Sequence, residues 1–367
     1  MCLPSWEAWT CVWASRIGDT LNYLYSIPHS IATAILSFLH INLPQLNYLL
    51  TWVIASIILL VVVMVNVIIL IYVERKELGR FMDRRGPFVV GPAGFFQNFA
   101  DAFKFLIKEM ILPENADGLG FNSTLVIVVA SSMLIMAVVP QAPDFYYTNT
   151  DLELLLAFAI FAIEPFAVVI AGWASNNKYS LLGGFRSTAQ MMSYEVPMLI
   201  TVLSVVVLAG TFNFTQIVNY QASHVWFVVP LIIGFIVFMI SIVAEIERIP
   251  FDTPDAEAEL VHGWMTEYAG IKFALFQLTS YVRSFAGAAI MVLIFLGGWT
   301  GPILPPILWF YIKVYAVFTL FVWLRASLPR VRIDQVLNLG WRSLLPLSLV
   351  NMLVAAFLKI YGGVFHL

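Results

Sequence analysis

Carboxylates gather in residues 245–267, which read EIERIPFDTPDAEAELVHGWMTE and hold seven acidic side chains against one arginine. Apolar stretches long enough to cross a bilayer flank this acidic segment, so its charges lie where charge is costly and uncommon. Carboxylates that lie close together raise one another's pKa and exchange protons as a coupled set. The acidic segment therefore predicts a site that handles protons or cations near a membrane surface; a solvated acidic loop is the plainer alternative.

The acidic segment also has the pattern of a helix start. Thr253 suits an N-cap and Pro254 suits the first helical position. Asp255, Glu257 and Glu259 then fall in or just after a first turn, where the helix dipole favours negative charge. Asp255 and Glu259 would share one face as a like-charge pair, which weakens an isolated helix slightly.

Ionisable residues also lie inside the apolar stretches or at their ends. They are Glu164, Glu195, Glu245, Glu247, Lys272, Arg283 and Lys313. Each alone could belong to a structural ion pair, but together they favour a proton relay. Moving one charge through a membrane is worth about 2.3 kcal/mol per 100 mV, so pumping would need a strongly downhill reaction supplied by a partner.

The composition is that of a polytopic membrane protein, with 61% hydrophobic and 11% charged residues in 367. We predict an all-α integral membrane protein. Eight segments are long enough to cross about 30 Å of hydrocarbon: 48–72, 122–141, 152–173, 187–211, 225–246, 268–296, 304–326 and 343–365.

Basic residues alternate between the predicted loops. The loops after the first, third, fifth and seventh spans hold Arg75, Lys76, Arg80, Arg84, Arg85, Lys104, Lys108, Lys178, Arg186, Arg248, Arg330, Arg332 and Arg342, whereas the second, fourth and sixth hold none. We call the membrane face with these cations the basic face. By the positive-inside rule it is cytoplasmic, and both termini lie on the outer side.

Residues 1–47 form a predicted N-terminal extension, and 48–367 a single transmembrane domain. Residues 31–43 are apolar but too short to span, which favours a surface-lying or re-entrant helix over an uncleaved signal anchor. Cys2 and Cys11 cannot ligate an iron–sulfur cluster alone, and the histidines form no close pair for haem or zinc. With no phosphate-loop or dinucleotide motif, we expect neither a bound metal nor a redox cofactor in this chain.

Two loops at the basic face have distinctive patterns. The first opens at Glu74, turns through RRGPFVVGPAG and continues into an amphipathic helical pattern that contains Asp101. This pattern predicts either a helix in the headgroup region or a cavity wall with an apolar, lipid-facing side and a polar side toward another protein. In the third loop, Gly183 and Gly184 predict a turn.

Together these segments resemble the quinone-chamber membrane subunit of respiratory complex I, called NuoH in bacteria. The resemblance covers residues 72–346. It rests on Glu74-Arg75-Lys76 with the later glycine–proline turn, ADAFKFLIKE, SNNKYSLLGGFRSTAQMMSYE, AEIERIPFDTPDAEAELVHG, FLGGW and PRVRIDQ. Several long strings in one order are far more specific than a single short motif.

The resemblance implies a subunit that encloses a tunnel for a lipid quinone, beneath a hydrophilic arm whose iron–sulfur clusters reduce the quinone head. It implies tunnel-facing or gating charges at Glu74, Arg75, Arg84, Asp101, Asp255, Glu257 and Glu259. It implies a proton path through Glu164, Glu195 and Glu245, with Arg248 close by, to which our relay adds Glu247, Lys272 and Lys313. Its implied partners are the iron–sulfur and quinone-site subunits, and small and antiporter-like membrane subunits.

Three positions depart from the family pattern. Phe88 replaces a polar residue, Glu247 is an added carboxylate in AEIER, and Ser280 stands where an intramembrane carboxylate is often found. These departures predict a rearranged proton path in which Glu247 replaces the charge missing at Ser280. They would suit a divergent or archaeal complex that oxidises NADH, a reduced deazaflavin or a ferredoxin and reduces ubiquinone, menaquinone or a phenazine lipid.

Two other functions compete with this prediction. Buried acids and lysines also suit a stand-alone cation or proton antiporter, although the spans show no obvious internal repeat. Membrane-bound hydrogenases use a similar subunit without a quinone. Either way we expect the chain in a membrane, with the prokaryotic plasma membrane favoured, and no nucleic-acid partner.

Overall fold

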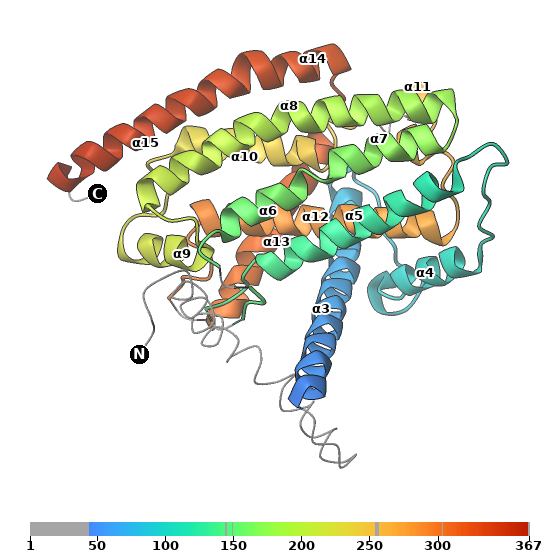
Figure 1. Cartoon of the computed structure of the whole chain (residues 1–367), viewed down its shortest axis with the longest axis horizontal. Coiled ribbons are helices and arrows are strands. Elements are labelled where there is room, and N and C mark those ends of the chain that lie inside the picture. Colours follow the sequence, from blue (N-terminus) through green and yellow to red (C-terminus); the bar gives the residue numbers. More distant parts are fainter. Residues whose placement is uncertain (1–43, 144, 149, 254–256, 303, 366–367) are drawn as a thin grey trace.

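The computed structural model describes residues 44–143, 145–148, 150–253, 257–302 and 304–365, and its regular structure there is helical (Figure 1). The longer helices are α3 (Pro44–Phe81), α5 (Gly118–Val138), α6 (Glu153–Phe161), α7 (Glu164–Ala174), α8 (Lys178–Ala209), α10 (Ile232–Glu245), α12 (Ile271–Phe295), α13 (Pro306–Ser327) and α15 (Leu345–Phe365). The shorter ones are η1 (Pro92–Gly94), α4 (Gln97–Ile107), α9 (Phe214–Ser223), α11 (Glu257–Leu260), η2 (Gly263–Met265), α14 (Ile333–Asn338) and the π-helical η3 (Leu339–Leu344).

These helices confirm the predicted all-α membrane fold. Seven helical segments of the described chain are long and apolar enough to cross a membrane, with α6 and α7 counted as one. The predicted fifth span is the shorter apolar helix α10. Its 14 residues extend about 21 Å, less than the hydrocarbon thickness, so the span is completed by non-helical backbone.

Helix α12 lies at the centre of the bundle. In the most apolar 18-residue stretch of α12, 83% of the residues are buried. The corresponding stretches of α3 and α15, at the periphery, are only 22% buried. Helix α8 packs against α7, α10 and α15, and Figure 1 shows α15 lying along it at one edge of the molecule. The central position of α12 means that any charge in its middle must find partners inside the protein.

The predicted third span, 152–173, is broken in the middle. Helix α6 ends at Phe161 and α7 begins at Glu164, with Pro165 in its first turn. Proline has no N–H to donate, which favours a new helix start at this point. The break places Glu164 at a helix N-terminus in the protein interior, where it is 4% exposed.

The predicted turn at Gly183 and Gly184 is wrong, because α8 already begins at Lys178. The Asn177 side chain caps it by accepting a hydrogen bond from Tyr179 N at 2.9 Å. A Cβ atom on Gly183 would lie 2.6 Å from the Gly263 Cα atom. Gly183 therefore serves a close approach between α8 and η2 and not a turn.

Helix α3 is longer than the predicted first span and continues to Phe81, so Glu74, Arg75 and Lys76 are helical and not part of a loop. The loop then turns at Gly91 and Gly94, whose φ angles are 75° and 80°. Both values lie in the left-handed region that glycine adopts readily. The predicted amphipathic helix follows as α4.

Within the acidic segment the structure describes helix α11 over Glu257–Leu260. The predicted first turn at Pro254 and Asp255 lies outside the described residues. The Thr253 hydroxyl donates to Gln190 Oε1 at 2.7 Å. Of the predicted N-terminal extension only residues 44–47 are described, as the start of α3.

Candidate functional site

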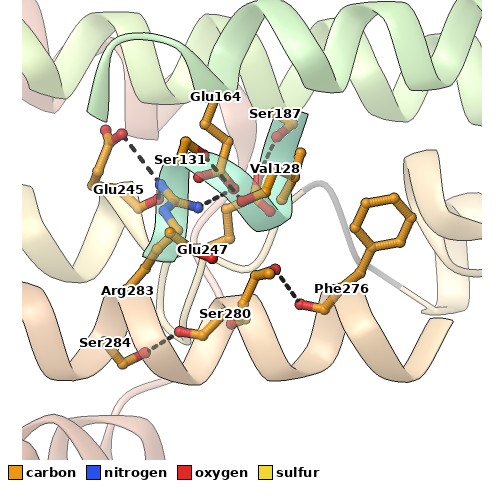
Figure 2. A network of polar contacts seen from close by, with 12 residues as sticks. Val128, Ser131, Glu164, Ser187, Glu245, Glu247, Phe276, Ser280, Arg283 and Ser284 are labelled. Atoms are coloured by element: carbon orange, nitrogen blue, oxygen red, sulfur yellow. Dashed lines mark hydrogen bonds and ion pairs between the residues drawn. The ribbon is translucent and has the colours of Figure 1, made fainter. Parts of the chain in front are cut away.

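Arg283, in the middle of α12, holds together two carboxylates from interrupted spans (Figure 2). Its Nη1 donates to Glu164 Oε1. Its Nη2 lies 3.4 Å from Glu245 Oε1 and donates to the Glu245 carbonyl oxygen at 3.2 Å. All three side chains are at most 6% exposed. Two buried carboxylates and one guanidinium favour the retention of a proton, because an uncompensated buried charge is expensive.

The ends of two helices complement these charges. Helix α10 ends at Glu245, and its C-terminal carbonyl groups favour the Arg283 cation. Helix α7 begins at Glu164, where the positive end of the helix dipole favours an anion. Interrupted helices whose ends meet a charge inside the membrane are a recurring way to build ion sites in transporters.

A buried glutamine holds the backbone beyond α10 in place. Gln190 Nε2 donates to the carbonyl oxygens of Ala244 at 2.8 Å and Phe251 at 2.7 Å. The Ser187 hydroxyl, one turn earlier on α8, donates to the Glu247 carboxylate. Glu247 adopts a φ of 54°, uncommon for a residue with a side chain. Helix α8 therefore holds the first part of the acidic segment in position through Ser187 and Gln190.

A second charged cluster surrounds Glu74 of α3, which is 4% exposed. Glu74 Oε1 accepts hydrogen bonds from Arg248 Nη1 at 2.7 Å and from Arg325 Nη1 of α13. The Arg248 guanidinium also lies 4.7 Å from the centre of the Tyr281 ring. Burial alone would lower the pKa of Arg248, but the negative charge of Glu74 outweighs burial and raises the pKa, so Arg248 remains a cation.

A cavity of about 200 Å³ joins the two clusters. Glu164, Glu247, Arg248 and Arg283 are among its lining residues. A smaller cavity lies beside Glu74. The two cavities have three lining residues in common, Ile246, Arg248 and Arg325. Charged side chains therefore follow one another from Glu74 at the basic face to the buried Arg283.

Several polar atoms of the two clusters have no hydrogen-bond partner among the described residues. They are Glu74 Oε2, Glu245 Oε2, Arg248 Nη2 and Arg283 Nε. Buried polar atoms in native proteins are nearly always satisfied, by ordered water where protein groups are absent. At about 30 Å³ per molecule, the larger cavity can take about six waters, enough for a hydrogen-bonded chain between carboxylates.

Helix α4 packs its polar face on α3. Arg75 Nη1 lies 2.5 Å from Asp101 Oδ2, and Asn98 Nδ2 donates to the Ile68 carbonyl oxygen at 3.0 Å. On the other side of α4, Phe103 and Ile107 are 63% and 82% exposed. Helix α4 therefore has the exposed apolar side expected of both predicted alternatives, the headgroup helix and the cavity wall, while part of its polar side is used within this chain.

Four more of the predicted site residues that the structure describes lie outside the two clusters, whereas Asp255 and the side chain of Glu257 are not among the described parts. Glu259 is exposed and pairs with Arg186 at 2.7 Å, and Arg84 is exposed in the first loop. Lys272, at the start of α12, donates to Asn122 Oδ1 at 2.7 Å. Glu195 is half-buried on α8 and within electrostatic reach of Glu245.

Lys313 has a different environment from every other predicted proton-path residue. Its Nζ donates to the carbonyl oxygens of Leu296, Gly298 and Thr300 at 2.8, 3.0 and 2.9 Å. Leu296 is 13 residues beyond Arg283, so these groups lie about 20 Å away from Arg283 along α12. Lys313 thus caps the far end of α12, opposite the basic face.

Sequence reasoning missed four residues of the site: Ser187, Gln190, Tyr281 and Arg325. Ser187 and Gln190 lie at the start of the predicted fourth span, and their spacing of three places them on one helix face. Arg325 lies just inside the predicted end of the seventh span. A cation at the basic-face end of an apolar helix was the signal that could have identified it as a partner for Glu74.

Among the described residues, a helical bundle with a cavity of about 200 Å³ between buried ion pairs defines a polytopic membrane protein with an intramembrane ionisable site. Residues 54–356 match the family model described as NADH dehydrogenase. The chain belongs to this family, in agreement with the resemblance carried by its loop sequences.

Curated relatives extend this finding. The chain is 43% identical over 295 residues to the NADH-quinone oxidoreductase subunit NuoH of Dehalococcoides mccartyi strain CBDB1, covering 80% of this chain and 83% of the relative. It is 42% identical over 329 residues to the corresponding NuoH protein of Brevibacillus brevis, covering 88% and 97%. The resemblance therefore holds over nearly the full length of a relative.

Proposed function

We propose that this chain is the membrane subunit of a proton-translocating quinone oxidoreductase of the complex I type. The observation that carries the proposal is the continuous line of charged side chains from Glu74 to Arg283, with a cavity between them. Such a line connects the basic face, where a reduction site in partner subunits would lie, with carboxylates inside the membrane. The names of the relatives favour a quinone as the substrate.

The chain would provide the wall and gate of the quinone chamber. Glu74 and Arg75 are adjacent on α3, yet their side chains lead to separate clusters: Glu74 to Arg248 and Arg325, and Arg75 to Asp101 on α4. A change at the chamber wall could therefore reach the interior through a single turn of α3. The carboxylates at 255, 257 and 259 and the cation at Arg84 would line or gate the same chamber.

Proton transfer would use the carboxylates around Arg283. Reduction of a quinone to a quinol consumes two electrons and two protons, which changes the charge balance at the chamber. The Glu74 cluster would respond first, and the Arg283 guanidinium could then favour Glu164 or Glu245 as its ionised partner. Glu195, near Glu245, would accept or release the proton toward neighbouring membrane subunits.

Glu247 would replace the carboxylate that is missing at Ser280. Both residues line the cavity of about 200 Å³, together with Glu164 and Arg283, and Figure 2 shows Glu247 between the Arg283 cluster and Ser280. A carboxylate contributed from either position would therefore face the same cavity. The shared cavity supports a rearranged proton path in which Glu247 keeps the number of carboxylates the same.

The iron–sulfur clusters that reduce the quinone would belong to partner subunits of a hydrophilic arm on the basic face. Small and antiporter-like subunits would complete the membrane part, in a prokaryotic plasma membrane with the basic face toward the cytoplasm. NADH is the electron donor favoured by the names of the relatives; a deazaflavin or ferredoxin donor, and menaquinone, ubiquinone or a phenazine as the acceptor, are distinguishable by assay.

Affinity purification of the tagged chain in a mild detergent tests the proposal. Mass spectrometry should find iron–sulfur subunits and antiporter-like subunits with a lipid quinone, and the preparation should oxidise NADH with a soluble quinone analogue. A nickel–iron partner without quinone would establish a hydrogenase instead. A homo-oligomer of this chain alone would establish an antiporter.

A further inference from the structure

A second large cavity lies far from the charged clusters, at the end of the bundle opposite the basic face. It has a volume of about 630 Å³, within the range of about 300–1,000 Å³ that is typical of small-molecule sites. It opens between the last turn of α8, helix α9 with the chain that follows it, and the outer half of α15. Figure 1 shows these three elements gathered at one edge of the molecule.

The walls of this outer cavity are mostly hydrocarbon. The apolar side chains that line it include Leu208, Val225, Phe227, Val229, Val354 and Leu358. Val225 and Val229 are 46% and 67% exposed. An apolar hollow at the surface of a membrane helix bundle is accessible to acyl chains from the bilayer.

One rim of the outer cavity carries a cation. Lys359 lines the cavity, and its Nζ donates to the Leu208 carbonyl oxygen at 2.7 Å. An ammonium group has three donors, so this bond leaves two for a ligand. Lys359 also lies 5.9 Å from the centre of the Tyr220 ring, which places its charge at the cavity.

His224 adds a second polar group to this rim. Its ring stacks on Tyr220 with a centroid distance of 4.3 Å, and Nδ1 is within 3.1 Å of Ser223 Oγ and the Tyr220 carbonyl oxygen. The imidazole is therefore held in place through one nitrogen, and Nε2 has no hydrogen-bond partner in the described part of the chain. The rings of Tyr220 and His224 lie where helix α8 ends, a depth at which aromatic side chains are common in membrane proteins.

We propose that the outer cavity binds one anionic phospholipid, with its phosphate at Lys359 and His224 and an acyl chain along the apolar wall. No acidic side chain is among the residues that line the cavity, so the charge of Lys359 is complementary to an anion. The shape of the cavity also favours a lipid. A hollow between three helical elements can take up a narrow acyl chain more readily than it can take up the broad face of a helix from another protein.

Photocrosslinking in nanodiscs tests the site. The intact complex would be placed in phosphatidylcholine nanodiscs that contain a small amount of diazirine-tagged phosphatidylglycerol or, separately, diazirine-tagged phosphatidylcholine. We expect crosslinks to peptides around 225–230 and 354–358, with about fivefold more from the anionic probe, the ratio that one lysine near a membrane surface supplies. Equal labelling by both probes would show a nonspecific lipid boundary and overturn the proposal.

Three variants separate charge from folding. Lys359→Gln should remove the preference for the anionic probe, and Lys359→Arg should keep it. Val354→Trp retains the lysine but narrows the hollow, so it should lower labelling by both probes in a complex that still assembles. Unchanged labelling in Lys359→Gln and Val354→Trp would contradict a lipid site. A variant complex that loses a partner subunit and not a lipid would contradict it as well.

Discussion

Arg283 and Lys313 are both cations within membrane spans, but their partners differ in kind. Arg283 contacts two carboxylates, and a cavity adjoins it. Lys313 contacts three backbone carbonyl oxygens at the end of α12. The carboxylates beside Arg283 can each take up and release a proton, whereas the carbonyl partners of Lys313 cannot, so there only the ammonium group itself is titratable. The two regions therefore differ in the number of titratable groups around the cation, with two carboxylates beside a cavity at Arg283 and a single ammonium group at Lys313.

Loss of Arg283 should have the largest effect. Arg283→Met leaves Glu164 and Glu245 buried without a cation, and removing one partner from a buried ion pair costs about 3–5 kcal/mol. We expect a strong reduction in assembled complex, measured by native gel electrophoresis of solubilised membranes. Lys313→Met is the matched control and should assemble. Equal yields of both variants would mean that the two cations are equivalent.

Replacement of the carboxylates should stop pumping without preventing assembly. Glu245→Gln and Glu164→Gln keep the side-chain volume but cannot bind and release a proton. We expect proton pumping in proteoliposomes to fall more than tenfold in each, measured by the quenching of a pH-sensitive dye. Pumping at the wild-type rate in both variants would remove the two glutamates from the path.

The chamber carboxylates should matter for quinone reduction. Asp255→Asn combined with Glu259→Gln should abolish quinone reduction or uncouple it from pumping, while the complex still assembles. The readout is the rate of reduction of a soluble quinone beside the rate of pumping. Arg332→Gln, which removes an exposed charge paired with Asp334, is a control for general loss of surface charge. Full pumping in the double variant would count against a gating role.

Glu247 offers a rescue experiment. Glu247→Gln should lower pumping several-fold, because one carboxylate of the cavity is lost. Ser280→Glu in the same chain should restore much of it, since both positions line the same space. The ratio of protons pumped to quinone reduced is the measurement. Unchanged pumping in the single variant Glu247→Gln would contradict the proposal that Glu247 replaces the carboxylate missing at Ser280.

Lys313→Met should have the smallest effect on activity. The carbonyl oxygens at the end of α12 lose a charged donor, which costs about 1–3 kcal/mol of stability. We expect a lower melting temperature with an unchanged ratio of protons to electrons, measured by thermal inactivation of the purified complex and by the pumping assay. A lower ratio of protons to electrons in a variant of normal stability would place Lys313 in the proton path.

The sequence predicted the spans well because hydropathy alone determines which segments enter a bilayer. It did not predict where helices stop inside the membrane. Pro165 is a local signal for the break before Glu164, but α10 begins only at Ile232, seven residues into the predicted fifth span. The contacts of Glu164 and Glu245 with Arg283 join residues far apart in the chain. The same holds for Arg325 and Gln190, whose roles follow from partners on α3 and beyond α10 and not from their local pattern.

The decisive measurement is the ratio of protons pumped to quinone reduced in Glu245→Gln. Wild type and variant would be purified as whole complexes, shown to contain the same subunits and reconstituted side by side. If the carboxylates around Arg283 conduct protons, the variant retains assembly and its ratio falls to near zero. A wild-type ratio would show that Glu245 is only a structural partner of Arg283 and that the protons take another route.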